Sequence, residues 1–258
     1  MTPQTLHVAT DPRGVVHVAL NTPDRRNVLS PAMIDDLTGL VQDIGRTARA
    51  VVLSGMGPVF CAGGDLDWMQ AQIRAGRAQR LAEARRLAGM LHALNTMPAP
   101  LIGRLHGGAF GGGIGLACVC DVALASDDTR FCFAETRLGL IPATIGPYVL
   151  ARMGEGRARR VFMSARVFDA AEAERLGIVA RAVPAGGLDA AVEAEVAPYL
   201  RVAPGAVAAA KRLARDLGPR IDEGVIEDSA RRLADIWEGA EAQHGISAFL
   251  ERRRPDWD

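Results

Sequence analysis

Hydrophobic and polar positions along the first 55 residues follow a strand period, then a helical period, then a strand period again. Residues 6–9 and 15–20 are predicted strands, and Asp-Pro-Arg-Gly at residues 11–14 favours a tight turn between them. Ser30 and Pro31 suit the cap and first position of a helix, and apolar residues then recur at helical spacing as far as Ile44. A short buried strand is predicted at residues 50–54.

The middle of the chain repeats this order. A long helix is predicted at residues 77–95, and the strand at residues 101–106 runs into a glycine-rich segment, residues 107–115. The apolar residues that follow, as far as Val119, predict a buried helix. Two further strands are predicted at residues 121–126 and 130–133.

Strand signals disappear from about residue 198 onward. Three helical patterns rich in Ala, Arg and Glu follow, at residues 207–217, 221–237 and 240–253. We therefore expect an α/β fold, with residues 1–197 as the core and residues 198–258 as a C-terminal helical region. The apolar faces of these helices need a packing partner, and we expect neighbouring subunits to provide it.

Composition restricts the classes of partner. The 258 residues are 49% hydrophobic and 23% charged, and thirty basic side chains balance thirty acidic ones. A net charge of zero gives no electrostatic reason to expect nucleic acid or an anionic membrane as the main partner. The N-terminal residues have no basic start followed by an apolar run, and no run reaches the roughly 18 apolar residues of a membrane helix. We expect a cytoplasmic protein.

Neither the cysteines nor the histidines have the spacing of a metal site. The cysteines lie inside apolar stretches, where buried reduced thiols are expected; they are Cys61, Cys118, Cys120 and Cys132. The five histidines are scattered along the chain without a helical His-x-x-x-His pair. We expect no metal.

Two loops share one design, in which a buried strand ends, several glycines follow and a helix begins. The first is Cys-Ala-Gly-Gly-Asp-Leu at residues 61–66, and the second is residues 107–115. Glycine lets backbone N–H groups approach a ligand closely, and at a helix start these groups lack partners within the helix. Together the two loops offer two donors for one developing oxyanion. The sequence lacks a phosphate-binding Gly-Lys-Ser/Thr, a Gly-x-Gly-x-x-Gly and a Gly-x-Ser-x-Gly elbow.

Glu135 is the carboxylate expected to carry chemistry. It follows the apolar stretch of residues 131–134, and poor solvation at the end of a buried strand raises a carboxyl pKa toward the range useful for proton transfer. The alternative is a structural acid paired with Arg137 or with a backbone amide, and the local sequence alone favours that alternative.

Taken together, these segments resemble the enoyl-CoA hydratase/isomerase (crotonase) family. The resemblance is carried by Phe-Cys-Ala-Gly-Gly-Asp-Leu at 60–66, the three glycines at 111–113, Cys-Asp at 120–121, and Glu135 with Leu-Gly-Leu-Ile-Pro at 138–142. Arg-Arg-Asn-Val-Leu-Ser at 25–30 resembles the N-terminal signature of the family. The resemblance implies a spiral of ββα turns, assembled as homotrimers or dimers of trimers. It also implies an acyl-CoA substrate, and no cofactor other than the coenzyme A that is part of that substrate.

The resemblance also implies roles for individual residues. The backbone N–H groups of Gly64 and Gly112 would form an oxyanion hole for the thioester carbonyl, with Glu135 as the catalytic carboxyl. The residues that would lie along the CoA moiety and the substrate are Ala62, Asp65, Leu66 and, near the adenine and phosphate end, Arg26 and Val28. Arg137 would contact a second carboxylate on the substrate, or would form a structural salt bridge.

One position departs from the family pattern. Family hydratases commonly carry a first glutamate just after the three glycines, and this chain has Gly115 there. Residues 133–149 look like the methylglutaconyl- and isohexenylglutaconyl-CoA hydratases, which favours hydration of a branched glutaconyl-type 2-enoyl-CoA. A Δ3-Δ2-enoyl-CoA isomerase with one glutamate is the alternative enzyme. The alternative that is not an enzyme is a protein that binds acyl-CoA without turnover.

Overall fold

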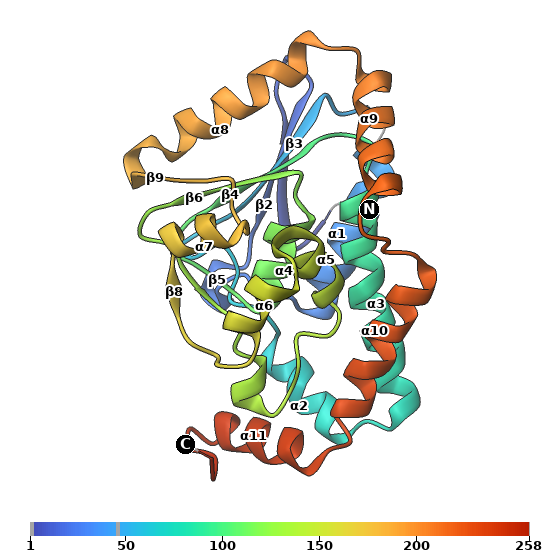
Figure 1. The fold of residues 1–258 in the computed structure, drawn as a ribbon, viewed down its shortest axis with the longest axis vertical. Helices are drawn as coiled ribbons and strands as arrows, with labels where there is room; N and C mark the ends of the chain where they lie inside the picture. The colour runs from blue at the N-terminus through green and yellow to red at the C-terminus, as the bar shows by residue number, and fades with distance from the viewer. Residues whose placement is uncertain (1–2, 45–46, 258) are drawn as a thin grey trace.

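The computed structural model describes residues 3–44 and 47–257 as a mixed α/β fold, in agreement with the predicted class (Figure 1). The strands are β1 (Leu6–Thr10), β2 (Val15–Leu20), β3 (Ala50–Gly55), β4 (Leu101–Leu105), β5 (Gly108–Phe110), β6 (Val122–Ser126), β7 (Arg130–Cys132), β8 (Phe168–Asp169) and β9 (Arg181–Val183). The α-helices are α1 (Pro31–Ile44), α2 (Leu66–Arg74), α3 (Arg77–Thr96), α4 (Gly112–Val119), α5 (Gly146–Met153), α6 (Glu155–Phe162), α7 (Ala170–Leu176), α8 (Leu188–Val196), α9 (Pro204–Leu217), α10 (Glu223–Ile236) and α11 (Ala240–Leu250). A 3-10 turn, η2 (Glu135–Leu138), follows β7.

The larger sheet has the strand order β1-β2-β3-β4-β6-β9. β1 and β2 form the antiparallel hairpin that the turn at residues 11–14 predicts, and each later pair in this sheet is parallel. Parallel sheets are covered on both faces and their strands are apolar throughout. β3 shows this, because its first four residues are all buried.

A second, three-stranded sheet has the order β5-β7-β8. The predicted strand at residues 101–106 ends at Leu105, and β5 was not predicted as a separate strand. The predicted strand at 130–133 is β7, which pairs with β5 and β8 rather than with the larger sheet. The local pattern predicts that a segment is a strand, but its partner depends on contacts distant in sequence.

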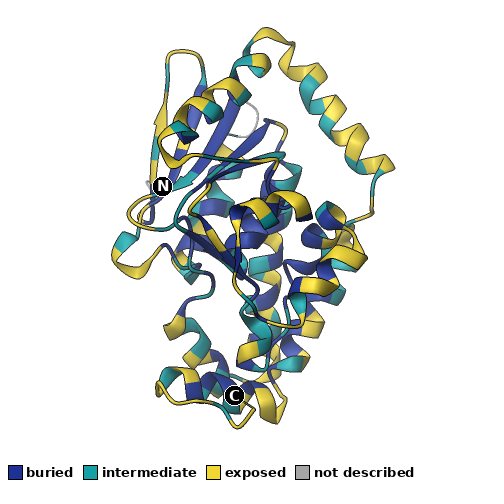
Figure 2. Ribbon diagram, turned by 60° about the vertical axis from the view of Figure 1, so that its left-hand side comes forward, coloured by how far each residue is buried: buried dark blue, intermediate teal, exposed yellow. Residues whose placement is uncertain are grey.

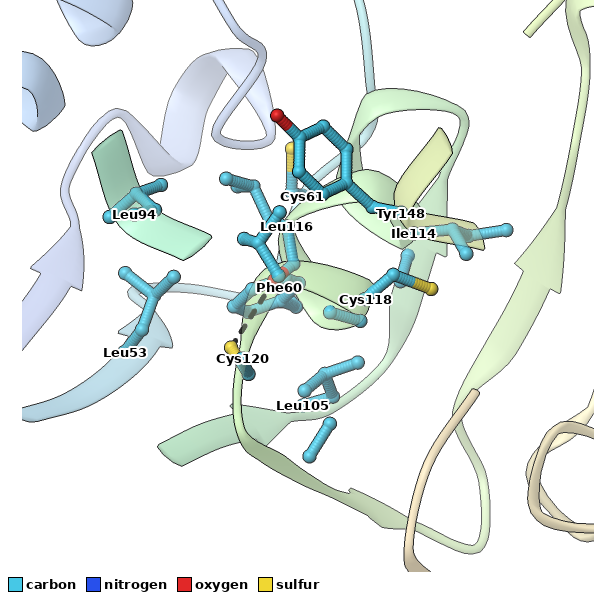
Figure 3. Packing of buried hydrophobic residues seen from close by; sticks show 14 of the residues in the cluster. Leu53, Phe60, Cys61, Leu94, Leu105, Ile114, Leu116, Cys118, Cys120 and Tyr148 are labelled. Carbon is cyan, nitrogen blue, oxygen red and sulfur yellow. Dashed lines mark hydrogen bonds between the residues drawn. The ribbon is translucent and has the colours of Figure 1, made fainter. Parts of the chain in front are cut away.

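The short helix α4 lies at the centre of the core. It is apolar all round, and every residue from Gly113 to Val119 is buried, which is typical of an enclosed helix. The thiol of Cys120 donates to the Leu116 carbonyl at 3.2 Å, among apolar side chains (Figure 3). All four cysteines are buried and unpaired, as predicted. Burial raises the thiol pKa to about 12 at Cys61, Cys118 and Cys120.

The C-terminal region forms three helices, as predicted, and two of them cover their own chain. α10 lies beside α3, and α11 packs against η2 (Figure 1). Trp237 and Ile246 are fully buried with Leu138 and Leu140 in one cluster, so these faces need no neighbouring subunit. α9 differs, because it contains no buried residue (Figure 2).

Within the described ranges, no helix combines the length and the apolar character needed to cross a membrane.

Candidate functional site

Three chain segments meet at one edge of the smaller sheet. β5 and β7 are parallel, with Phe110 opposite Cys132, so both strands end at this edge. A single parallel bridge between Cys61 and Ala109 places a third segment along the other side of β5. Residues that follow the carboxyl ends of parallel strands face a shared crevice. The chain therefore brings residues 62–64, 111–113 and 133–135 together.

The two glycine loops touch backbone to backbone. Gly63 has φ +92°, and a Cβ there would lie 2.8 Å from the Phe110 carbonyl oxygen. The same Cβ would lie 3.8 Å from the Gly112 nitrogen. Only glycine permits both the positive φ and this close approach. The glycines of residues 61–66 are thus required to bring this loop against the start of α4.

The N–H groups of Gly64 and Gly112 are available as donors. Both residues are partly exposed, whereas Gly63, Gly111 and Gly113 are buried. Neither N–H donates a hydrogen bond to another described residue. Gly112 is the first residue of α4, where the helix carries partial positive charge. Gly64 and Gly112 line the same cavity, of about 90 Å³.

Glu135 lines this cavity too. A Cβ at Gly111, whose φ is +46°, would lie 3.0 Å from Glu135 Oε1, so the carboxyl lies directly against the start of α4. Although the residue as a whole is half-buried, its Oε2 is fully buried and has no partner among the described residues. Burial raises the pKa of Glu135 from 4.5 to about 7, partly offset by a hydrogen bond to a backbone amide. This carboxyl can therefore accept and return a proton near neutral pH.

The rest of the cavity wall is largely apolar and comes from distant parts of the chain. Trp68 of α2 donates its indole N–H to Glu83 and meets Trp237 edge-on, with 5.9 Å between ring centroids. Leu233 and Trp237 close the cavity from the C-terminal region. These aromatic and aliphatic residues were not predicted as part of the site, because their spacing shows only that they face a core. The site is thus completed by residues beyond 197.

Ile145 occupies the space next to Gly115. A Cβ at Gly115 would lie 2.3 Å from Ile145 Cγ2 and 3.0 Å from Ile145 Cβ. Ile145 is only 2% exposed and lines the cavity. Where the family pattern has a glutamate, this chain therefore has Gly115 together with the bulky side chain of Ile145, thirty positions later. The cavity wall at this point is apolar.

The residues expected along CoA lie on two adjacent segments outside the cavity. The Ala62 N–H donates to the Arg26 carbonyl at 3.0 Å, and the Leu29 N–H donates to the Gly63 carbonyl at 2.8 Å. Arg26 is exposed, whereas Val28 and Ala62 are partly buried. Asn27 was not predicted to have a role; it is buried, and its side-chain amide donates to the carbonyls of Met56 and Val59.

Three other predicted residues occupy different settings. Asp65 is buried, accepts a hydrogen bond from the Trp68 N–H at the start of α2, and lies 2.8 Å from the Arg25 guanidinium. Leu66 is 43% exposed. Arg137 is not among the residues that line the cavity. Its guanidinium donates instead to the Ala165 carbonyl at 2.8 Å. Arg137 therefore does not pair with Glu135.

Across residues 3–44 and 47–257, no group of three or more His, Cys, Asp or Glu side chains is placed to hold a metal ion.

Comparison with known proteins shows the family and the fold of this chain. The family model described as enoyl-CoA hydratase/isomerase matches residues 10–258. A putative enoyl-CoA hydratase of Thermus thermophilus is 33% identical over 247 residues, which cover 93% of this chain and 96% of that protein. The solved structure of an enoyl-CoA hydratase from Mycobacterium avium matches with a TM-score of 0.84 at 30% identity, covering 99% of both chains. Pseudomonas aeruginosa AtuE matches with a TM-score of 0.78 at 37% identity, covering 98% of this chain and 99% of that one.

Proposed function

Because the chain belongs to the enoyl-CoA hydratase/isomerase family, we propose that it hydrates a 2-enoyl-CoA thioester through an enolate held by Gly64 and Gly112. The observation that carries this proposal is that Gly64, Gly112 and Glu135 line one cavity. The main-chain N–H groups of the two glycines have no hydrogen-bond acceptor among the described residues, and the carboxyl of Glu135 is poorly solvated. Two N–H groups that bind a thioester oxygen as it gains charge stabilise the transition state. Loss of one such donor typically costs about 3 kcal/mol.

Glu135 supplies the proton transfer in this proposal. As the water oxygen bonds to C3, the electron pair of the C2=C3 bond moves onto the thioester oxygen and the carboxylate of Glu135 takes a proton from the water. Glu135 then returns this proton to C2 of the enolate. A positioned carboxyl contributes on the order of 10²–10⁴-fold to such a step when its pKa lies near the working pH. A pKa of about 7 meets that condition.

A branched glutaconyl-type acyl chain is the proposed substrate. It is supported by the resemblance of residues 133–149 to hydratases of that class. The apolar wall around Ile145 and Leu140 suits a carbon branch. Arg137 is directed to Ala165, so the proposal assigns it no contact with the distal carboxylate of the substrate.

Isomerisation of a 3-enoyl-CoA is the second candidate, and one observation favours it. Ile145 fills the space beside Gly115, and among the described residues Glu135 is the one carboxylate that lines the cavity. Moving one proton between C2 and C4 needs a single carboxyl and no bound water.

Absorbance of the conjugated thioester separates the candidates. With crotonyl-CoA or 3-methylglutaconyl-CoA, a hydratase lowers this absorbance and incorporates one water per turnover. If neither substrate changes while a 3-enoyl-CoA becomes conjugated, the isomerase is the correct assignment. Glu135→Gln should abolish turnover and leave CoA affinity near that of the wild type. Binding without turnover by the wild-type protein would instead identify an acyl-CoA binding protein.

We also propose a homotrimer or a dimer of trimers as the assembly. It is supported by α9, which has no buried residue and exposes Leu213 and Leu217 by 59% and 80%. Light scattering on the purified chain measures the mass, and a monomer at micromolar concentration would contradict this proposal.

A further inference from the structure

Hydration requires a group that orients the attacking water, and Gly115 cannot provide one. Among the described residues that line the cavity, Glu135 is the sole carboxylate. A side chain at residue 115 would collide with Ile145. If the proposed hydration is correct, another residue on the wall must hold the water.

Thr144 has the required position and chemistry. It immediately precedes Ile145, lines the cavity with Glu135 and Gly112, and is only 4% exposed. No side-chain hydrogen bond among the described residues involves its hydroxyl, and its oxygen is not one of the fully enclosed polar atoms that lack a partner. The hydroxyl oxygen is therefore accessible, and it can both donate to and accept from a molecule bound in the cavity.

The other polar side-chain groups on the wall do not suit a nucleophilic water. The Trp68 indole N–H is committed to Glu83 at 3.1 Å. The Trp237 indole offers an N–H donor and no acceptor. A water molecule becomes a better nucleophile when its hydrogens are donated to acceptors, because this raises the electron density on its oxygen. A carboxylate and a hydroxyl oxygen both accept, whereas an indole N–H only donates.

We propose that Thr144 is a positioning residue, which accepts one hydrogen bond from the water while Glu135 accepts the other. The water oxygen then bonds to C3, the C2=C3 electron pair moves onto the thioester oxygen, and the water proton passes to Glu135. Glu135 returns that proton to C2 as the oxyanion reverts to a carbonyl. The sum is addition of one water, with Glu135 a carboxylate again.

Packing around Ile145 gives Thr144 a defined position. Ile145 contacts the helix α4 through the space at Gly115, and α5 begins at the next residue, Gly146. A residue held between a buried anchor and a helix start loses little freedom when it binds water. Such preorganisation is what a positioning role requires.

Two reactions of one enzyme test the proposal. Hydration of crotonyl-CoA or 3-methylglutaconyl-CoA needs the water. Exchange of the C2 protons of butyryl-CoA in D₂O needs the oxyanion hole and Glu135 but no water at C3. Thr144→Val should lower kcat for hydration roughly tenfold to a hundredfold, which corresponds to one lost hydrogen bond in a buried site. Its rate of butyryl-CoA exchange should stay within about twofold of the wild type, since the enolate chemistry is intact.

Thr144→Ser is the matched control, because it keeps the hydroxyl and should retain hydration within about threefold. Ile145→Val changes the neighbouring side chain without touching the hydroxyl and should keep the ratio of hydration to exchange. Equal losses of hydration and exchange in Thr144→Val would show a structural role and overturn the proposal, as would unchanged hydration. A wild-type enzyme that exchanges C2 protons but adds no water would refute the proposed hydratase, and the role of Thr144 with it.

Discussion

The contact between Gly115 and Ile145 gives a prediction whose size follows from the structure. Gly115→Ala places a Cβ 2.3 Å from Ile145 Cγ2, against an ordinary carbon–carbon separation of about 3.5–4.0 Å. Ile145 must therefore move by more than about 1 Å in a packed core, which typically costs 1–3 kcal/mol. Alanine regains about 1 kcal/mol of helix propensity over glycine, because residue 115 lies inside α4. The expected net loss of unfolding free energy is roughly 0–2 kcal/mol.

In a protein that already carries Ile145→Ala, the effect of Gly115→Ala on the unfolding free energy should change from destabilising to stabilising. Ile145→Ala alone should destabilise by about 2–5 kcal/mol, since Ile145 is 2% exposed and a cavity is left. In this background the Cγ2 contact is gone and the 3.0 Å contact with Cβ needs only a small shift, so Gly115→Ala should stabilise by up to about 1 kcal/mol. The coupling energy between the two substitutions should be about 1–3 kcal/mol.

Urea unfolding of the four proteins at one protein concentration measures this coupling. Glu135→Gln in parallel is a control that lines the same cavity but does not meet residue 115. Additivity of Gly115→Ala and Ile145→Ala within about 0.5 kcal/mol would refute the packing described for this wall.

Four further predictions concern Gly112, Glu135 and Asp65. Gly112→Pro removes the N–H at the first position of α4, where proline is tolerated, and should lower kcat by about 10²–10³-fold. Gly112→Ala keeps the N–H and should retain more activity, so equal losses of kcat in the two variants would argue against a donor role for this N–H. Because the carboxylate form of Glu135 must accept the proton, kcat/KM should rise with pH through about 7, and a flat profile from pH 5.5 to 8.5 would contradict this. Because the pKa of Glu135 is raised in the folded state, the folded protein holds a proton that the unfolded protein releases between about pH 4.5 and 7. The stabilisation from protonated Glu135 is therefore complete below about pH 4.5 and is lost as pH rises through about 7. Glu135→Gln should remove this part of the pH dependence of the unfolding free energy. Asp65→Ala removes the cap of α2 and the partner of Arg25, and should lower stability by about 0.5–2 kcal/mol or more, whereas Asp65→Asn keeps most of the cap; equal stability of both variants in urea would contradict the capping role.

The sequence predicted those parts of the fold that depend on local pattern. The hairpin of β1 and β2, the helix α3 and the apolar helix α4 all follow from periodicity and turn residues. The pairing of β7 with β5 did not follow, because strand partners are chosen by contacts distant in sequence. β5 itself is three residues long, too short to show a period.

The candidate site was predictable to the same degree. The two glycine loops and Glu135 stand out because glycines at strand ends and a carboxyl after an apolar run are locally unusual. The choice of Gly64 and Gly112 within those loops came from the family resemblance. Trp237 gave no such signal, since an aromatic residue on a helix is ordinary core until its neighbours are known. The position of Arg137 depends on the carbonyl of Ala165, 28 residues away, which no local pattern shows.

The proposed mechanism requires the main-chain nitrogens of residues 64 and 112 to bind a single thioester oxygen. A crystal structure of this chain with acetoacetyl-CoA would show whether they do. The thioester oxygen should lie within about 2.7–3.1 Å of both nitrogens, with the C2 carbon beside the carboxyl of Glu135. A thioester oxygen bound elsewhere, or bound by only one of the two nitrogens, would contradict it.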